Sequence, residues 1–148
     1  MRGDSPPRLR EPTEFACLPS AARWARRHVV GVLHRWRLCG FADTAELLVS
    51  ELVTNAYRAS GADVERHGHA ASAKVPCIGM RLTSDRRSLL IEVWDASPKP
   101  PVLKDVDAHA EGGRGLVPVD SLAERPNFYF PRSGGKVVWC EITERSDS

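Results

Sequence analysis

Two polar side chains, four positions apart in an otherwise apolar helical segment, are the residues best suited to chemistry. Glu51 and Asn55 fall within residues 48–56, where most other positions are apolar. Residues four apart lie one above the other on a helix. Asn55 offers a neutral oxygen to Mg²⁺, an ion that binds through one or two protein oxygens plus water and phosphate. Glu51 is placed to take a proton from an attacking hydroxyl or water, although the pair also fits the polar edge of a half-exposed helix.

Asp95 is the second candidate, because it ends a hydrophobic run at residues 89–94. A buried carboxylate at that point can accept a hydrogen bond from the exocyclic amino group of adenine. A hydrogen bond to a charged group contributes about 1.5–3 kcal/mol. The alternative is that Asp95 is only a turn or capping residue.

A glycine-rich segment supplies the third candidate. Gly113 and Gly115 flank Arg114, and Leu116 follows as the start of an apolar helical pattern. Glycines let the backbone approach a ligand closely, and the N–H groups of a first helical turn attract phosphate. Arg114 adds a guanidinium that can bind two phosphate oxygens. Taken alone, the segment also fits a flexible loop with glycine at its end.

The first half of the chain predicts two helices. Residues 1–13 carry three prolines among charged residues and predict a disordered tail, followed by a short strand at 15–18. Helical spacing of apolar residues predicts a helix from Ser20 to Gly40 and another from about Asp43 to Gly61. Residues 61–76 are expected to form a loop.

The second half predicts two hairpins separated by a long loop. Residues 78–83 and 89–94 form the first, and residues 128–130 and 137–142 form the closing one. Residues 96–112 lack periodicity and have the length of a ligand-covering loop, and residues 116–123 suggest a short helix. This order predicts one α+β domain over residues 14–143, a two-layer sandwich with helices on one face of a mixed sheet.

Composition narrows the class of protein. The chain has 148 residues, of which 42% are hydrophobic and 27% charged, as is typical of a soluble domain. A net charge of +2 argues against DNA binding. The four cysteines are far apart and form no CxxC pair, so free thiols are expected rather than a zinc site. No apolar run suggests a signal peptide or a membrane span, and a cytoplasmic location is expected.

Four segments together resemble the Bergerat-fold (GHKL, histidine-kinase-like) ATPases, and within them the stand-alone anti-sigma-factor serine kinases. Residues 48–56 resemble the asparagine box, and residues 91–95 resemble the strand that leads to the adenine-binding aspartate. Residues 113–116 resemble the second glycine box, and residues 134–139 resemble the last hairpin. The resemblance covers residues 15–142, and the four motifs fall in the family's order.

The resemblance implies that the chain binds ATP with Mg²⁺ under a lid formed by residues 96–112. It implies that Glu51 acts as the base toward a serine of a partner protein, that Asn55 holds Mg²⁺ and that Asp95 binds adenine. Ser97, Gly113, Arg114, Gly115 and Leu116 would complete the nucleotide site. The family's partners are a sigma factor and an anti-sigma antagonist, and its members often form homodimers.

The chain departs from the family pattern at several positions. Ser97 and Lys99 replace the glycines of the first glycine box, and Lys136 and Val137 stand where many members carry threonines. These departures leave open a second interpretation, in which the domain is a non-catalytic interaction module with weak or no ATP binding.

Overall fold

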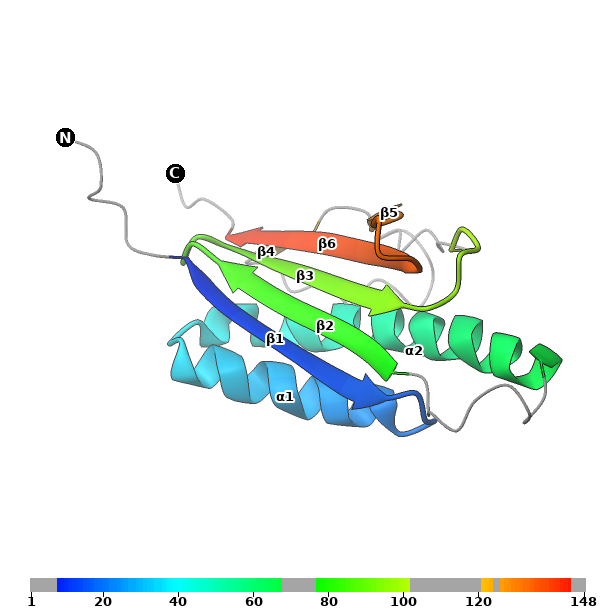
Figure 1. Cartoon of the computed structure of the whole chain (residues 1–148). Coiled ribbons are helices and arrows are strands. Elements are labelled where there is room, and N and C mark those ends of the chain that lie inside the picture. The colour runs from blue at the N-terminus through cyan, green and yellow to red at the C-terminus, as the bar shows by residue number, and fades with distance from the viewer. Residues whose placement is uncertain (1–7, 68–76, 102–120, 124–125, 145–148) are drawn as a thin grey trace, which may run out of the picture.

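The computed structural model describes residues 8–67, 77–101, 121–123 and 126–144. Two helices lie side by side against one face of a six-stranded sheet, which makes a two-layer α+β structure (Figure 1). The expected layering is therefore confirmed. The strands are β1 (Leu9–Ala16), β2 (Cys77–Ser84), β3 (Ser88–Asp95), β4 (Ser121–Ala123), β5 (Asn127–Tyr129) and β6 (Lys136–Glu144).

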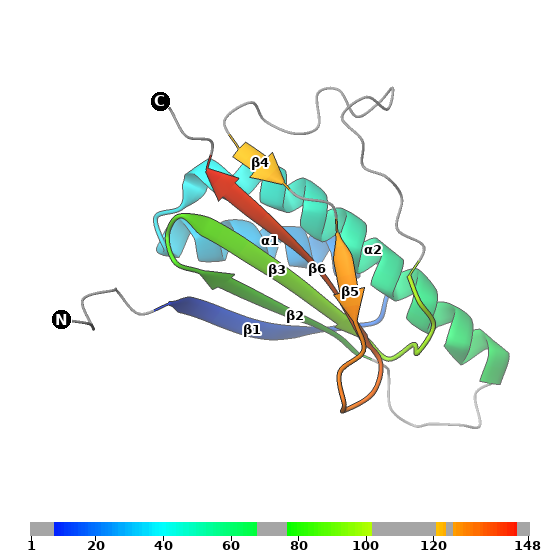
Figure 2. The same ribbon diagram turned by 90° about the horizontal axis from the view of Figure 1, so that it is seen from above.

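The described strands pair in the order β1-β2-β3-β6-β4, and β5 also pairs with β6. Every one of these pairings is antiparallel, so the expected mixed sheet is wrong for the described strands. Because β3 pairs with β6 along nearly its full length, β4 and β5 share the other edge of β6 (Figure 2). Both expected hairpins, β2–β3 and β5–β6, are present.

Strand β1 begins earlier than the sequence indicated. It starts at Leu9, so residues 9–13 belong to the sheet rather than to a disordered tail, and the domain begins before residue 14. Alternate side chains of β1 are half-buried against the helices, which favours a strand despite the charges. Pro12 is tolerated because β1 pairs only with β2 among the described strands, and an edge strand can lack one N–H donor.

The two helices are α1 (Ala21–Arg35) and α2 (Ala42–His67). Helix α1 ends at Arg35 rather than at Gly40, because Arg37 takes a positive φ of 60° and a 3₁₀ turn follows at Cys39–Phe41. Helix α2 continues through Gly61, where an end was expected. A glycine inside a helix costs only about 1 kcal/mol, which neighbouring turns can offset.

One further expectation is wrong. Residues 121–123 form β4, which pairs with residues 142–144 of β6, where a short helix was predicted over 116–123. A three-residue strand is too short to show the period-two alternation by which strands are recognised. Residues 116–120 lie outside the described residues.

The core lies between the helices and the inner face of the sheet. Arg26 of α1 donates a hydrogen bond to Ser50 Oγ of α2 at 2.9 Å, which links the two helices. No disulfide joins the four cysteines. Among the described helices, none combines the length and apolarity needed to cross a membrane. The largest fully buried side chains come from both layers: Val29, Val32, Leu33, Phe41, Val49, Val53, Ile78, Leu82, Leu89, Ile91, Val93 and Ile142.

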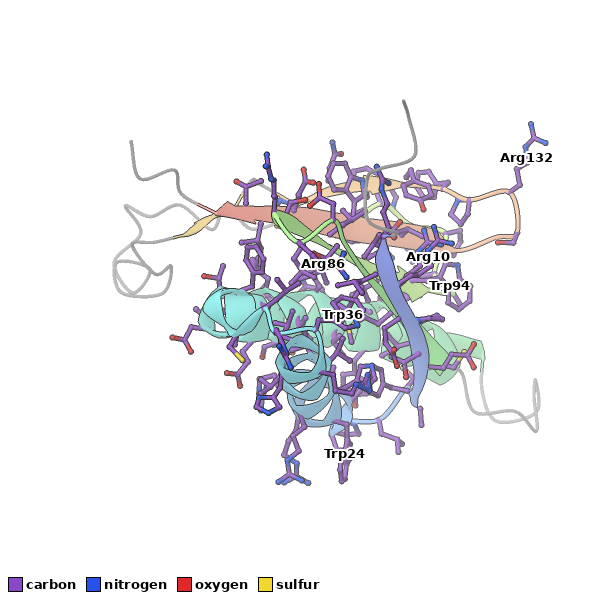
Figure 3. The ribbon with its side chains drawn as sticks, turned by 90° about the vertical axis from the view of Figure 1, so that its left-hand side faces the viewer. Arg10, Trp24, Trp36, Arg86, Trp94 and Arg132 are labelled. Atoms are coloured by element: carbon purple, nitrogen blue, oxygen red, sulfur yellow. The ribbon has the colours of Figure 1, made fainter. Side chains whose placement is uncertain are left out.

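Trp24 lies on the opposite side of α1 from the core and points away from the sheet (Figure 3). It is 49% exposed, and the guanidinium groups of Arg23 and Arg27 lie 5.8 and 5.3 Å from its ring centre. Trp24 is therefore an exposed apolar side chain on α1, and the homodimer that the resemblance implies stays a prediction.

His28 makes the stability of the fold depend on pH. Its Nε2 atom is buried without a hydrogen-bond partner among the described residues, and the ring of Phe15 packs edge-on against it at 6.0 Å. Burial lowers the pKa of His28 below its ordinary value of 6.5; nearby Glu11 opposes this shift and Arg35 reinforces it. The unfolded chain therefore binds the proton more readily than the folded one.

We expect the contribution of His28 to the free energy of unfolding to be fully present above about pH 6.5 and to be lost as the pH falls below that value. Urea unfolding at several pH values measures this, and His28→Gln should flatten the dependence over that window. His34→Gln on the exposed side of α1 is the matched control, and an equal flattening there would contradict the assignment.

Candidate functional site

Asp95 and Lys136 form a buried ion pair at the point where β3 ends and β6 begins. The two residues are direct cross-strand partners, so their side chains leave the sheet on the same face, toward the helices. The side chains are 1% and 3% exposed, and Lys136 Nζ lies 2.9 Å from Asp95 Oδ1. The predicted adenine acceptor is thus a buried carboxylate that already accepts a hydrogen bond from an ammonium group.

Ser97 lies directly against this carboxylate. Its backbone N–H donates to Asp95 Oδ1 at 2.9 Å, and its own Oγ accepts from the backbone N–H of Lys99 at 3.3 Å. Ser97 is 1% exposed. The structure therefore brings together two of the predicted site residues, and the chain turns around the carboxylate as it leaves β3.

The turn of the β5–β6 hairpin holds the backbone of this site. Gly135 has a φ of +74°, and a Cβ added there would overlap the carbonyl oxygen of Asp95 and approach Trp94 Nε1 to 2.8 Å. Trp94 Nε1 in turn donates to the carbonyl of Gly134 at 2.8 Å. Glycine at 135 is needed for both the conformation and the close approach, which fixes Lys136 opposite Asp95.

Glu51 and Asn55 lie one turn apart on α2, and both are half-buried. Helix α2 packs against both β3 and β6, the strands that carry Asp95 and Lys136. Helical periodicity places Asn55 about 140° around the helix from Ser50, the residue that faces α1. Asn55 therefore lies on the flank of α2 directed away from α1. Glu51, one turn before it, lies on the same surface of the helix.

The Cys17 thiol lies between α2 and the neighbourhood of Asp95. Burial raises the pKa of the Cys17 thiol; the nearby Ser60 hydroxyl partly offsets this, and the negative charge of Asp95 adds to the rise. Cys17 Sγ also donates to the carbonyl of Tyr57 at 3.9 Å. Ser60 is 2% exposed and lies against Cys17, but its Oγ makes no hydrogen bond of good geometry among the described residues.

The sequence did not reveal that the Lys136 ammonium binds Asp95, or that Cys17 lies near enough to respond to the Asp95 charge. Lysine at a strand end is usually a solvated residue, and only the register between β3 and β6 shows that it is buried. The predicted phosphate-binding residues Gly113, Arg114, Gly115 and Leu116 lie outside the described residues, as does most of the predicted lid.

The described residues suit Mg²⁺ only in company with phosphate. They contain no group of three or more His, Cys, Asp or Glu side chains able to hold a metal ion. Asn55 with Glu51 offers an amide oxygen and a carboxylate, and Mg²⁺ commonly takes one or two such ligands while phosphates and water supply the rest. The donor set therefore fits magnesium carried by a nucleotide.

No family model matches the chain, and no curated protein matches it significantly.

Proposed function

We propose that this chain is an ATP- and Mg²⁺-binding regulatory protein of the Bergerat type, similar to the anti-sigma-factor serine kinases. The observation that carries the proposal is the buried carboxylate of Asp95, 1% exposed, at the junction of β3, β6 and α2. A buried charge is retained at a cost, and such groups are more frequent at functional sites. Asn55 and Glu51 occupy the helix that covers the same junction.

In this proposal Asp95 and Lys136 bind the nucleobase together. The carboxylate accepts the exocyclic amino group of adenine, and Ser97 N–H and Lys136 Nζ hold it in one orientation. An ammonium group has three N–H donors, so Lys136 can also donate to a ring nitrogen of the base. Lysine thereby supplies a hydrogen-bond donor at a position where many members of the family carry a threonine.

The flank of α2 serves the phosphate end. ATP supplies the phosphoryl group, and Asn55 contributes an oxygen ligand to the magnesium that accompanies it. Glu51, one turn away, accepts the proton from a serine hydroxyl of the partner protein. The partner would be an anti-sigma antagonist or a sigma factor, and the protein would act in the cytoplasm to control transcription.

A second function is favoured by the Lys136–Asp95 pair itself. Each of the two charges already has its counter-ion inside the fold, so neither charge requires a ligand to neutralise it. A domain of this kind can serve as a non-catalytic interaction module that sequesters a protein without ATP. Calorimetry distinguishes the two functions, because only the first predicts heat of binding when Mg²⁺ and ATP are added.

We expect ATP to raise the melting temperature only when Mg²⁺ is present. Ligand at 100 times its Kd stabilises the folded state by about 2.7 kcal/mol, which scanning calorimetry readily detects. Asn55→Ala should remove the magnesium dependence, whereas Glu51→Gln should keep the shift and stop transfer of labelled phosphate to the antagonist.

Thr54→Ala is the matched control, because Thr54 is a half-buried polar residue on the same helix. It should leave both binding and transfer unchanged. If ATP stabilises the Asn55→Ala protein as much as the wild type in the presence of Mg²⁺, the metal assignment is wrong.

A further inference from the structure

The outer face of the sheet carries a row of side chains that crosses five strands. The strand register places Glu14 of β1 beside Gly79 of β2, and Gly79 beside Trp94 of β3. Trp94 pairs with Val137 of β6, which pairs with Tyr129 of β5. All five residues line one groove of about 710 Å³. This face is opposite the helices, and no described helix covers it (Figure 1).

Gly79 has no side chain and therefore deepens the groove at its centre. A Cβ at this position would meet Trp94 Cβ at 3.5 Å, an ordinary contact distance, so the packing within the chain does not demand glycine. The missing side chain leaves the flank of the Trp94 indole open. Pro12 and Pro131 line the groove on either side of the row. The groove therefore presents aromatic, proline and valine surface around a central depression.

The polar groups of the groove are largely paired with one another. Arg81 donates to both carboxylate oxygens of Glu92 at 2.8 and 3.0 Å, and the Tyr129 hydroxyl donates to the same carboxylate at 3.4 Å. The Trp94 indole N–H donates to Gly134. A ligand is therefore bound mainly through apolar contact with ring faces and not through these hydrogen bonds.

The charge of the groove is negative at one end. Its lining includes two carboxylates, Glu14 and Glu92, against one guanidinium, that of Arg81. Because Arg81 neutralises Glu92, the excess negative charge is that of Glu14 on the edge strand. Glu14 and Cys77 both line the groove, and burial together with the Glu14 carboxylate raises the pKa of the Cys77 thiol. The complementary ligand carries a cation at this end.

The groove also limits the backbone conformation of the ligand. Strands β2, β3 and β6 are paired on both sides, so a ligand on this face cannot extend the sheet by adding a strand. A polyproline II segment needs no such pairing, because its backbone stays solvated, and it binds characteristically to aromatic-lined grooves. Five strands span about 19 Å at about 4.8 Å per spacing, the length of about six residues of polyproline II.

We propose that this groove binds a proline-rich segment of a partner protein, with an arginine or lysine of that segment beside Glu14. Its prolines would pack on Trp94 and Tyr129, over Gly79. The site goes beyond the proposed nucleotide function and does not depend on it, because Asp95 and the helix flank lie on the other face of the sheet.

The test is a fluorescence titration with three synthetic peptides: six prolines flanked by arginines, six prolines flanked by glutamates, and a glycine-serine spacer flanked by arginines. We expect the arginine-flanked proline peptide to bind about tenfold more tightly than either of the others. Glu14→Lys should reverse the preference toward the glutamate-flanked peptide. Gly79→Leu should abolish binding, whereas Thr83→Leu, on the same face of β2 but outside the groove, should not.

Several results would overturn the proposal. These are equal binding of the three peptides, unchanged selectivity in Glu14→Lys, and full binding by a folded Gly79→Leu protein. A dimer in sedimentation that Gly79→Leu breaks would show instead that the face binds a second copy of the chain. A protein that fails to bind ATP but binds the proline peptide would refute the nucleotide function alone.

Discussion

Replacing Asp95 by alanine is expected to lower the free energy of unfolding by about 3–5 kcal/mol. The Lys136 ammonium is 3% exposed, and the substitution removes the carboxylate 2.9 Å away from it. A buried charge without its counter-ion bears a desolvation cost that the rest of the site cannot offset. Guanidinium unfolding near neutral pH measures the loss as a lower midpoint with an unchanged slope.

The double variant Asp95→Ala, Lys136→Met separates charge from packing. Removing both charges leaves no ion buried at this junction, and replacement of such pairs by apolar residues is often neutral or stabilising. We expect the double variant to recover most of the stability that Asp95→Ala loses. Additive losses at the two positions would show that the residues do not interact. The same protein should show no stabilisation by ATP, although its fold is intact.

Replacing Gly135 by alanine is expected to lower the free energy of unfolding by about 2–6 kcal/mol. The new Cβ would overlap the Asp95 carbonyl oxygen, and the residue would have to keep a φ of +74°. A non-glycine residue in such a conformation costs about 1–3 kcal/mol, and forcing an extra carbon into packed structure adds about 1–3 kcal/mol. We expect the backbone of the hairpin turn to shift in order to relieve the overlap, and this shift would displace Lys136 from Asp95.

Gly134→Ala is the matched control, because Gly134 also has a positive φ, of 101°, but a Cβ there meets nothing within 4 Å. It should bear the conformational cost alone. Thermal unfolding of both variants gives the comparison. If the two substitutions cost the same, the contact between the hairpin turn and the Asp95 carbonyl does not constrain the site.

Much of the fold could be predicted from local pattern. The apolar spacing that contains Leu48, Leu52 and Ala56 identified α2, and the hydrophobic run at residues 89–94 identified β3. The errors fall where local preference is weak and tertiary contacts decide. Residues 9–13 are charged and contain a proline, yet they pair with β2, and the three residues of β4 are ordered by their pairing with β6.

The sequence identified individual residues of the candidate site but not the contacts that join residues from different elements. Glu51 and Asn55 share a helix, so their spacing alone places them together. The Asp95–Lys136 pair joins positions far apart in the chain, and only the register of β3 on β6 reveals it. The lysine at that position was visible as a departure from the family pattern, but its burial and its bond to the carboxylate depend on tertiary structure.

The order of the elements has a consequence for synthesis of the protein. Strand β1 and both helices precede β2 in the sequence, yet β1 pairs with β2, and α2 buries its apolar face against β2, β3 and β6. A chain growing from the ribosome therefore exposes the apolar face of α2 before the strands that cover it exist. Until β6 emerges, the nascent chain is prone to aggregation and is a natural client for chaperones.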